Sequence, residues 1–259
     1  MNIVIVTDME GIAGLDLWEM SKPSIPEEYA KGVVCLEADT NAAVKGFFDG
    51  GADNVYVVDG HMSGHNMNPE RIDKRAKVIR LEWQDLLKEG KIDACALVGM
   101  HAMAGAENAF IDHTQSEARW FDYSINGISC GELVQLAAFA GAFGVPVIMA
   151  SGDVAAEKEF RKFIGDKALF ATVKKAIKRN VAITEDVDRS RESIYECAKN
   201  SIALIKDIKP YKVNLPAEVR VVFQRPDYCD DAAERYERID SRTVRKSVEK
   251  IESYFSLLL

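Results

Sequence analysis

The chain lacks the features that mark secreted or membrane-spanning proteins. Its five cysteines are dispersed, odd in number and form no CxxC pair, so we expect reduced thiols and no disulfide framework. No basic segment precedes the first apolar run, as it would in a signal peptide. The most apolar stretch, Leu133 to Ala150, is interrupted by Gln, Gly and Pro, whereas a membrane-spanning helix needs about 20 apolar residues. These absences predict a soluble, cytoplasmic protein that does not enter a membrane.

Basic residues are in deficit too, with 33 Lys and Arg against 41 Asp and Glu and a formal net charge of −8. A protein that binds nucleic acid without regard to sequence needs a basic footprint on the phosphates. The charge balance therefore argues against a nucleic-acid partner. With 259 residues, 47% of them hydrophobic, the chain is long enough for one large domain or two modest ones with a sizeable core.

Short β-branched runs alternate with longer helical patterns in the first 150 residues. The expected buried strands are Ile3–Thr7, Val55–Val58, Ala94–Val98 and Val145–Ala150, and the expected helices are Glu28–Gly50, Arg80–Lys88 and Glu132–Phe143. Such alternation predicts an α/β fold with a mostly parallel, Rossmann-like sheet and helices on both faces. Asn126-Gly127 tolerates positive φ in a tight turn and predicts an inserted hairpin between Arg119–Ile125 and Ile128–Cys130.

The pattern changes after Asp153, where charged amphipathic segments dominate. Helices are expected at Ala155–Ile164, Arg191–Lys206, Asp230–Glu237 and Val248–Leu258, and a strand is expected at Glu218–Gln224. The lysines and arginine of Val173–Val181 predict a basic helix face, which is usually solvated. We therefore expect a catalytic domain at residues 1–153 and a smaller α+β part at 154–259 packed against it.

Acids and histidines follow several of the predicted strands. Asp8 and Glu10 follow the first, His61 the second and His101 the third, while Glu132 opens a helix beside the hairpin. In a parallel α/β sheet, ligands bind outside the carboxyl ends of the strands, where these residues converge. Carboxylates and imidazoles together are ligands that Zn²⁺ prefers, and five ligands exceed the needs of one tetrahedral zinc. The pattern indicates a centre for two metal ions.

Each of these residues has an ordinary interpretation when taken alone. A single Asp after a strand is more often a cap or turn former, and an acid such as Glu132 often stabilises a helix N-terminus. The distribution of histidine argues for a shared site, because the sequence contains four and all lie between His61 and His113.

Six segments in order resemble the zinc-dependent D-aminopeptidases of peptidase family M55. They are Asp8–Gly14 (DMEGIAG), Asp59–His61 (DGH), Gly99–Ala102 (GMHA), Asp112–Thr114 (DHT), Gly131-Glu132 and Ser151–Asp153 (SGD). The likeness extends to Arg238–Val244 (RIDSRTV) near the C-terminus. The resemblance implies a dinuclear zinc hydrolase that removes N-terminal residues, typically D-amino acids, from short peptides. It also implies a ring-like homo-oligomer.

The same resemblance implies roles for individual residues. Asp8 would bridge two zinc ions, and the two metal shells would be completed by Glu10, His61, His101 and Glu132. His113 matches a histidine assigned as the catalytic nucleophile, although it could equally act as a general base.

Four positions depart from the family pattern, namely Gly60, His65, Asp112 and Thr114. Asp112 could orient the neighbouring imidazole. His65 could face the substrate, although an exposed surface histidine is the more ordinary reading. These departures leave the metal site intact and bear on the choice of substrate.

The sequence thus predicts a metallo-aminopeptidase with two Zn²⁺ per subunit. Two alternatives stay open at this stage: a dinuclear amidohydrolase or phosphoesterase acting on another small molecule, and a non-catalytic Rossmann-like binding module. The sequence does not reveal the substrate, its stereochemistry, the metal in the cell or the number of subunits.

Overall fold

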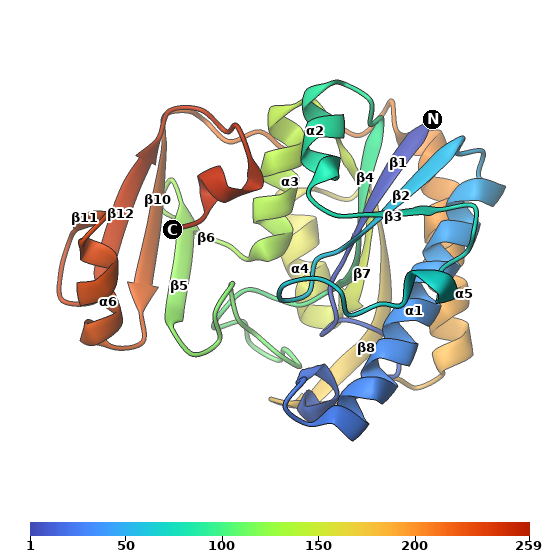
Figure 1. The fold of residues 1–259 in the computed structure, drawn as a ribbon, viewed down its shortest axis with the longest axis horizontal. Helices are drawn as coiled ribbons and strands as arrows, with labels where there is room; N and C mark the ends of the chain where they lie inside the picture. The colour runs from blue at the N-terminus through green and yellow to red at the C-terminus, as the bar shows by residue number, and fades with distance from the viewer.

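The computed structural model describes residues 1–259 and contains two β-sheets, the larger of them flanked by helices (Figure 1). The larger sheet has the strand order β3-β2-β1-β4-β7-β8-β9. Its strands are β1 (Asn2–Thr7), β2 (Asn54–Asp59), β3 (Lys77–Ile79), β4 (Ala94–Met100), β7 (Val147–Asp153), β8 (Leu169–Lys178) and β9 (Val181–Ile183). Neighbours are parallel from β3 to β8, and β9 alone is antiparallel. This confirms the predicted mostly parallel sheet.

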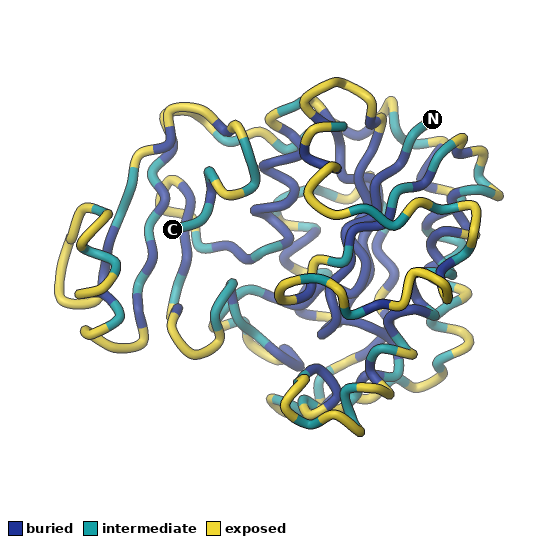
Figure 2. The backbone as a smooth tube through the Cα atoms, viewed as in Figure 1, coloured by how far each residue is buried: buried dark blue, intermediate teal, exposed yellow.

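Helices cover both faces of the larger sheet, as predicted. On one face α1 (Pro26–Asp49) packs against α5 (Val187–Ser201), and the other face carries α2 (Glu82–Lys88), α3 (Glu132–Ala142) and α4 (Val154–Phe163) (Figure 1). The central strand β1 is enclosed, and residues 3–6 are at most 4% exposed. Burial on both faces explains why these strands are continuous apolar runs without alternation. Figure 2 shows the resulting core as dark tube through the centre of the sheet.

The smaller sheet is antiparallel, with the order β11-β12-β10-β5-β6. Its strands are β5 (Trp120–Ile125), β6 (Ile128–Ser129), β10 (Ala217–Phe223), β11 (Glu237–Arg238) and β12 (Thr243–Val248), and α6 (Pro226–Ala233) packs on it. The predicted hairpin is confirmed, because Asn126 and Gly127 connect β5 to β6 with φ of 52° and 76°. Short 3₁₀ turns complete the chain, namely η1 (Trp18–Ser21), η2 (Pro69–Arg71), η3 (Ile202–Leu204) and η4 (Tyr254–Leu257).

The two sheets do not follow the predicted division after residue 153. The larger sheet continues into β8 and β9, and the smaller sheet takes β5 and β6 from the preceding part of the chain. The physical reason is long-range pairing. β5 lies between β6 and β10, and its pairing with β10 joins segments that are almost 100 residues apart, which no local pattern encodes.

Three local predictions in the C-terminal part require correction. Residues 173–181 form the end of β8 and the start of β9, so the predicted basic helix face is wrong; Lys174 is buried and Lys175 exposed, the alternation of a strand. Of the helix predicted at 248–258, only the turn η4 forms. The predicted helix at 230–237 instead starts at Pro226, where proline suits the first helical turn, and ends at Ala233.

All five cysteines are free, in agreement with the sequence. None of the helices combines the length and the apolar character that crossing a bilayer requires.

Candidate metal centre

The candidate ligands gather at one edge of the larger sheet. Asp8 follows β1, His61 follows β2, and His101 follows β4, so the parallel strands deliver them to the same end. Glu132 is the first residue of α3 and enters from the side of the hairpin. Asp8, Glu10, His61 and His101 are at most 7% exposed. Their convergence at this edge is the arrangement expected of a parallel α/β sheet.

Close backbone approach fixes the loop that carries the first two acids. The backbone N–H of Asp8 donates to Val98 O at 2.7 Å, and that of Gly11 donates to Gly99 O at 2.8 Å. A Cβ on Gly11 would lie 2.1 Å from Met100 O, and Gly99 has φ of 78°. Only glycine fits these two positions. The absence of a side chain there allows the DMEG segment (Asp8–Gly11) to pack directly against the end of β4.

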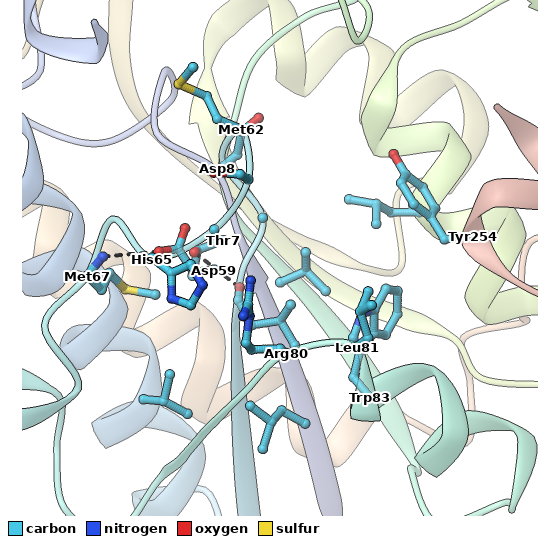
Figure 3. Close-up of a pocket in the computed structure, with 18 of the residues that line it drawn as sticks. Thr7, Asp8, Asp59, Met62, His65, Met67, Arg80, Leu81, Trp83 and Tyr254 are labelled. Carbon is cyan, nitrogen blue, oxygen red and sulfur yellow. Dashed lines mark hydrogen bonds between the residues drawn. The ribbon is translucent and has the colours of Figure 1, made fainter. Parts of the chain in front are cut away.

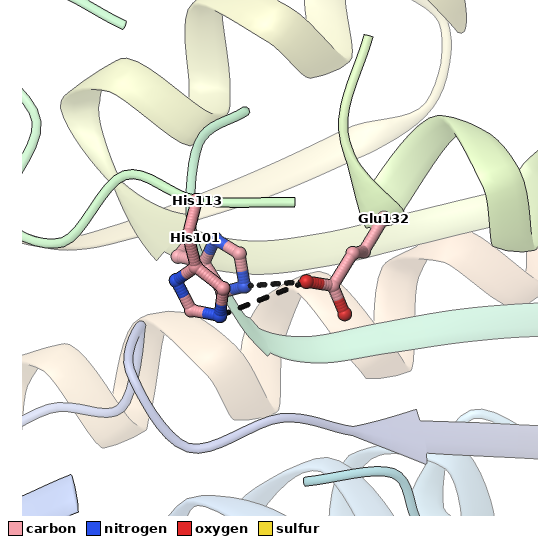
Figure 4. Close-up of side chains that lie close together, drawn as sticks. All are labelled: His101, His113 and Glu132. Carbon is pink, nitrogen blue, oxygen red and sulfur yellow. Dashed lines mark ion pairs between the residues drawn. The ribbon is translucent and has the colours of Figure 1, made fainter. Parts of the chain in front are cut away.

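His101 lies beside two carboxylates of the cluster. Its Nδ1 lies 3.0 Å from the Ala102 carbonyl oxygen, to which it donates a hydrogen bond. In the neutral ring Nε2 then carries the free lone pair. Nε2 lies 3.3 Å from Asp8 Oδ2 and 3.4 Å from Glu132 Oε1. His113 stacks on this ring with centroids 4.0 Å apart, and its Nε2 lies 3.7 Å from the same Glu132 oxygen (Figure 4).

Glu10 and His61 form the other half of the cluster. His61 Nε2 lies 3.3 Å from Glu10 Oε1. Asp8 joins the halves, since one ligand atom each from Asp8, Glu10 and His101 lie within 4.8 Å of one another. All five predicted ligands and His113 therefore occupy one connected group, with Asp8 in the middle.

The donor atoms of this group fit a zinc centre better than a hydrogen-bond network. Around a tetrahedral zinc with bonds of about 2.0–2.2 Å, two ligand atoms lie roughly 3.3–3.6 Å apart. The separations that His61 and His101 make with the carboxylates, 3.3–3.4 Å, match this spacing and exceed the hydrogen-bond optimum of about 2.9 Å. Several buried atoms also have no hydrogen-bond partner, namely Glu10 Oε2, His61 Nδ1, His101 Nε2 and His113 Nδ1. Buried polar atoms without partners are costly, and a bound cation would satisfy the carboxylate oxygen and an imidazole lone pair.

The acids and imidazoles perturb one another strongly. Burial, and next the charge of Glu10, raise the pKa of Asp8 to about 6. Burial opposes protonation of His61, but the Glu10 carboxylate outweighs it and raises its pKa to about 9. Burial, and then the neighbouring His101, lower the pKa of His113 to about 4. Three carboxylates in one buried cluster thus require positive charge nearby. Among the three imidazoles, only His113 has a pKa below its ordinary value.

Two further residues support the cluster from outside. The Gln115 backbone N–H donates to Glu132 Oε1 at 2.7 Å. Lys174 reaches from β8 to the DMEG loop, where its Nζ donates to Glu10 O at 2.8 Å and to Leu15 O. Burial lowers the pKa of Lys174 to about 8. No sequence signal pointed to Gln115, because this residue contributes a backbone group. Lys174 is predicted on a helix face, because the neighbouring lysines conceal the alternation of a strand.

Asp112 and His65, which depart from the family pattern, lie outside the metal cluster. The Asp112 carboxylate pairs with Arg179 and accepts from the Gly105 N–H at 2.8 Å, and it makes no hydrogen bond to the His113 ring. The expectation that Asp112 orients this imidazole is not supported. His65 is exposed with φ of 72° and lies outside the metal cluster, on the wall of an adjoining cavity.

That cavity opens directly onto the cluster. It has a volume of about 550 Å³, and Asp8 and Glu132 belong to its lining. Its walls come from the ends of β1, β2 and β3, from α2 and from the C-terminal turn that carries Tyr254 (Figure 3). A volume of this order suits a small-molecule ligand.

A comparison with family models identifies the chain. The model of the D-aminopeptidases, Peptidase M55, matches residues 1–259. The chain belongs to the D-aminopeptidase family.

Two relatives of this family member illustrate the likeness. The D-aminopeptidase of Bacillus subtilis (strain 168) is 29% identical over 184 residues, which span 70% of this chain and 66% of that protein, just under two thirds of its length. Among solved structures, the chain resembles the Zn-dependent D-aminopeptidase DppA from Bacillus subtilis, described as a self-compartmentalizing protease. The TM-score is 0.91 at 22% identity, covering 100% of this chain and 96% of that one. The family and the fold agree with the sequence prediction.

Proposed function

We propose that this member of the D-aminopeptidase family is a dinuclear zinc aminopeptidase that releases N-terminal residues, D-amino acids among them, from short peptides. The observation that carries the proposal is the buried cluster of three carboxylates and three imidazoles, in which ligand atoms lie 3.3–3.4 Å apart and several buried polar atoms have no partner. A non-catalytic binding module would have no use for such a cluster, because unpaired buried charge lowers stability.

The geometry suggests how the residues divide between two ions. Glu10 and His61 would hold one, His101 and Glu132 would hold the other, and Asp8, which lies between the pairs, would be a ligand of both. Two zinc ions carry four positive charges against the three negative charges of the carboxylates, which meets the electrostatic need of the cluster. When bound, such a pair polarises a carbonyl and lowers the pKa of water, which is the chemistry that peptide hydrolysis requires.

His113 is the catalytic residue in this proposal. Its ring stacks on that of His101, and its buried Nδ1 has no partner within the protein. The His113 imidazole can take a proton from the attacking water and return one to the leaving amine, or attack the carbonyl directly. Binding of the free α-amine of a peptide at this centre would place the first peptide bond beside His113 and favour its cleavage.

Assembly is the second part of the proposal. The related DppA is described as self-compartmentalizing. We propose a ring-like homo-oligomer for this chain by that likeness, in which access to the centre would be limited to short peptides. Sedimentation or light scattering of the purified protein tests it; a monomer would contradict it.

Elemental analysis combined with a peptide panel tests the catalytic proposal. We expect about two zinc ions per chain, release of the first residue from D-Ala-D-Ala or its L counterpart, loss of turnover on chelation and its return with Zn²⁺. Unchanged turnover after complete metal removal would refute the mechanism. Metal-dependent turnover confined to phosphate esters or non-peptide amides would favour the alternative hydrolases.

A further inference from the structure

Many of the residues that line the cavity beside the metal cluster are hydrophobic, and together they are called the apolar wall. The apolar wall includes Val78, Leu81, Trp83, Leu136 and Phe255. Leu81 and Phe255 are 61% and 57% exposed, although both are large apolar side chains. They come from segments more than 170 positions apart, which the fold brings to the same cavity. An exposed apolar surface beside a reaction centre is typical of a binding site for an apolar group.

One strong cation is present in this lining, and no carboxylate pairs with its side chain. Arg80 follows β3, is exposed and takes part in none of the ion pairs of the protein. The nearby Glu82 carboxylate accepts from the Arg80 backbone N–H at 2.8 Å and not from the guanidinium. Figure 3 shows the Arg80 side chain between His65 and Leu81. The guanidinium is therefore free to bind an anion.

The acids of the cavity do not compete for Arg80. Asp59 accepts from the backbone N–H groups of Asn66 and Met67 at 2.6 and 3.0 Å and from the Asn66 side chain at 2.7 Å. Asp8 and Glu132 belong to the metal cluster. The cavity thus presents acids at the reaction centre, an apolar wall and one unpaired guanidinium.

We propose that Arg80 binds the terminal carboxylate of a short peptide, while the apolar wall takes up the side chain of that terminal residue. The inference rests on the proposed function and names its substrate class: di- or tripeptides with a free carboxylate and an apolar last residue. A guanidinium matches a carboxylate with two parallel hydrogen bonds, which makes it a selective reader of this group. Holding both ends of the peptide would limit substrate length as well as identity.

Matched acid and amide substrates test the role of Arg80. Wild type, Arg80→Met and Arg80→Lys are compared on D-Ala-D-Leu and its C-terminal amide, or on the L forms if those are the ones cleaved. We expect wild type to favour the acid over the amide by about 10- to 100-fold in kcat/KM, mainly through KM, since hydrogen bonds to charged groups have such strength. Arg80→Met should lower kcat/KM for the acid to about that for the amide, and Arg80→Lys should keep part of the preference.

Arg75→Met is the matched control. Arg75 pairs with Asp73 at 2.6 Å outside the cavity, so its loss should leave the acid-to-amide ratio unchanged. An equal ratio in wild type and Arg80→Met would overturn the inference, while turnover of both substrates would leave the proposed function standing. If zinc-loaded wild type cleaves neither peptide, the proposed function fails. Calorimetric titration with the same pair then decides the inference separately: tighter binding of the acid by wild type but not by Arg80→Met supports it, and equal binding overturns it.

A substrate series tests the apolar wall. With D-Ala at the first position, kcat/KM should rise as the last residue changes from Gly to Ala to Leu. Leu81→Asp should flatten this series, because a carboxylate beside Arg80 repels the apolar side chain and competes for the cation. A series that is flat in wild type would overturn the assignment of the wall.

Discussion

The two sheets differ in how their charged side chains are buried and paired. At the edge of the larger sheet, Asp8, Glu10 and His101 are buried, and several of their polar atoms have no partner. On the smaller sheet, Arg245 is 41% exposed at its side chain and forms ion pairs with Glu218 and Glu237 at 3.1 and 2.8 Å. Exposed ion pairs are screened and contribute little, whereas buried unpaired charge is costly. A concentration of buried polar atoms without partners, more than the number of charges, therefore marks the functional region.

The largest effect should follow from removing a central donor of the buried cluster. His101→Ala should lose zinc and lower peptide turnover by at least about 1,000-fold, because the metal contributes several kcal/mol to the transition state. Zinc content and kcat/KM measure this. His65→Asn is the control for zinc content: it removes an exposed histidine outside the cluster, and asparagine tolerates its positive φ. Full zinc content in His101→Ala would contradict the ligand assignment.

His113 separates catalysis from metal binding within the same cluster. His113→Ala should lower kcat by about 100- to 10,000-fold, the usual contribution of a general acid–base residue, while zinc content stays at the wild-type level. Steady-state kinetics and elemental analysis of one preparation test both statements. Loss of zinc together with activity would make His113 a ligand instead.

A substitution of the buried Lys174 tests whether its side chain stabilises the loop that carries Glu10. Lys174→Met removes hydrogen bonds to two carbonyls of the DMEG loop and should lower the free energy of unfolding by about 1–3 kcal/mol. It should also weaken zinc binding, because Glu10 lies on that loop. Lys175→Met, on the exposed face of the same strand, is the control. Urea unfolding and competition with a zinc chelator measure the two effects; identical behaviour of the two variants would show that Lys174 does not hold the loop.

The smallest effect is expected on the smaller sheet. Arg245→Ala removes both exposed ion pairs and should leave the midpoint of urea unfolding within experimental error. Turnover should also be unchanged. A clear loss of stability in Arg245→Ala would contradict the statement that exposed ion pairs on the smaller sheet contribute little.

Much of the larger sheet was predictable from local sequence, because β-branched runs and helical periodicity are short-range signals. The candidate ligands were found by a positional rule, since residues after parallel strands share an edge, and the family resemblance assigned their roles. The helical predictions for 173–181 and 248–258 failed because charge and local apolar spacing do not reveal which neighbours a segment pairs with.

The sequence by itself determined the parallel α/β architecture, the Asn-Gly hairpin and the residue types suited to a metal centre. Only the tertiary structure decided that β5 pairs with β10, that Lys174 lies beneath the DMEG loop, and that Arg80 shares a cavity with the C-terminal turn. The physical reason is the range of the interactions. Backbone propensity and patterning act over a few residues, whereas burial, unpaired charge and cavity walls arise from segments that meet only after the chain has folded.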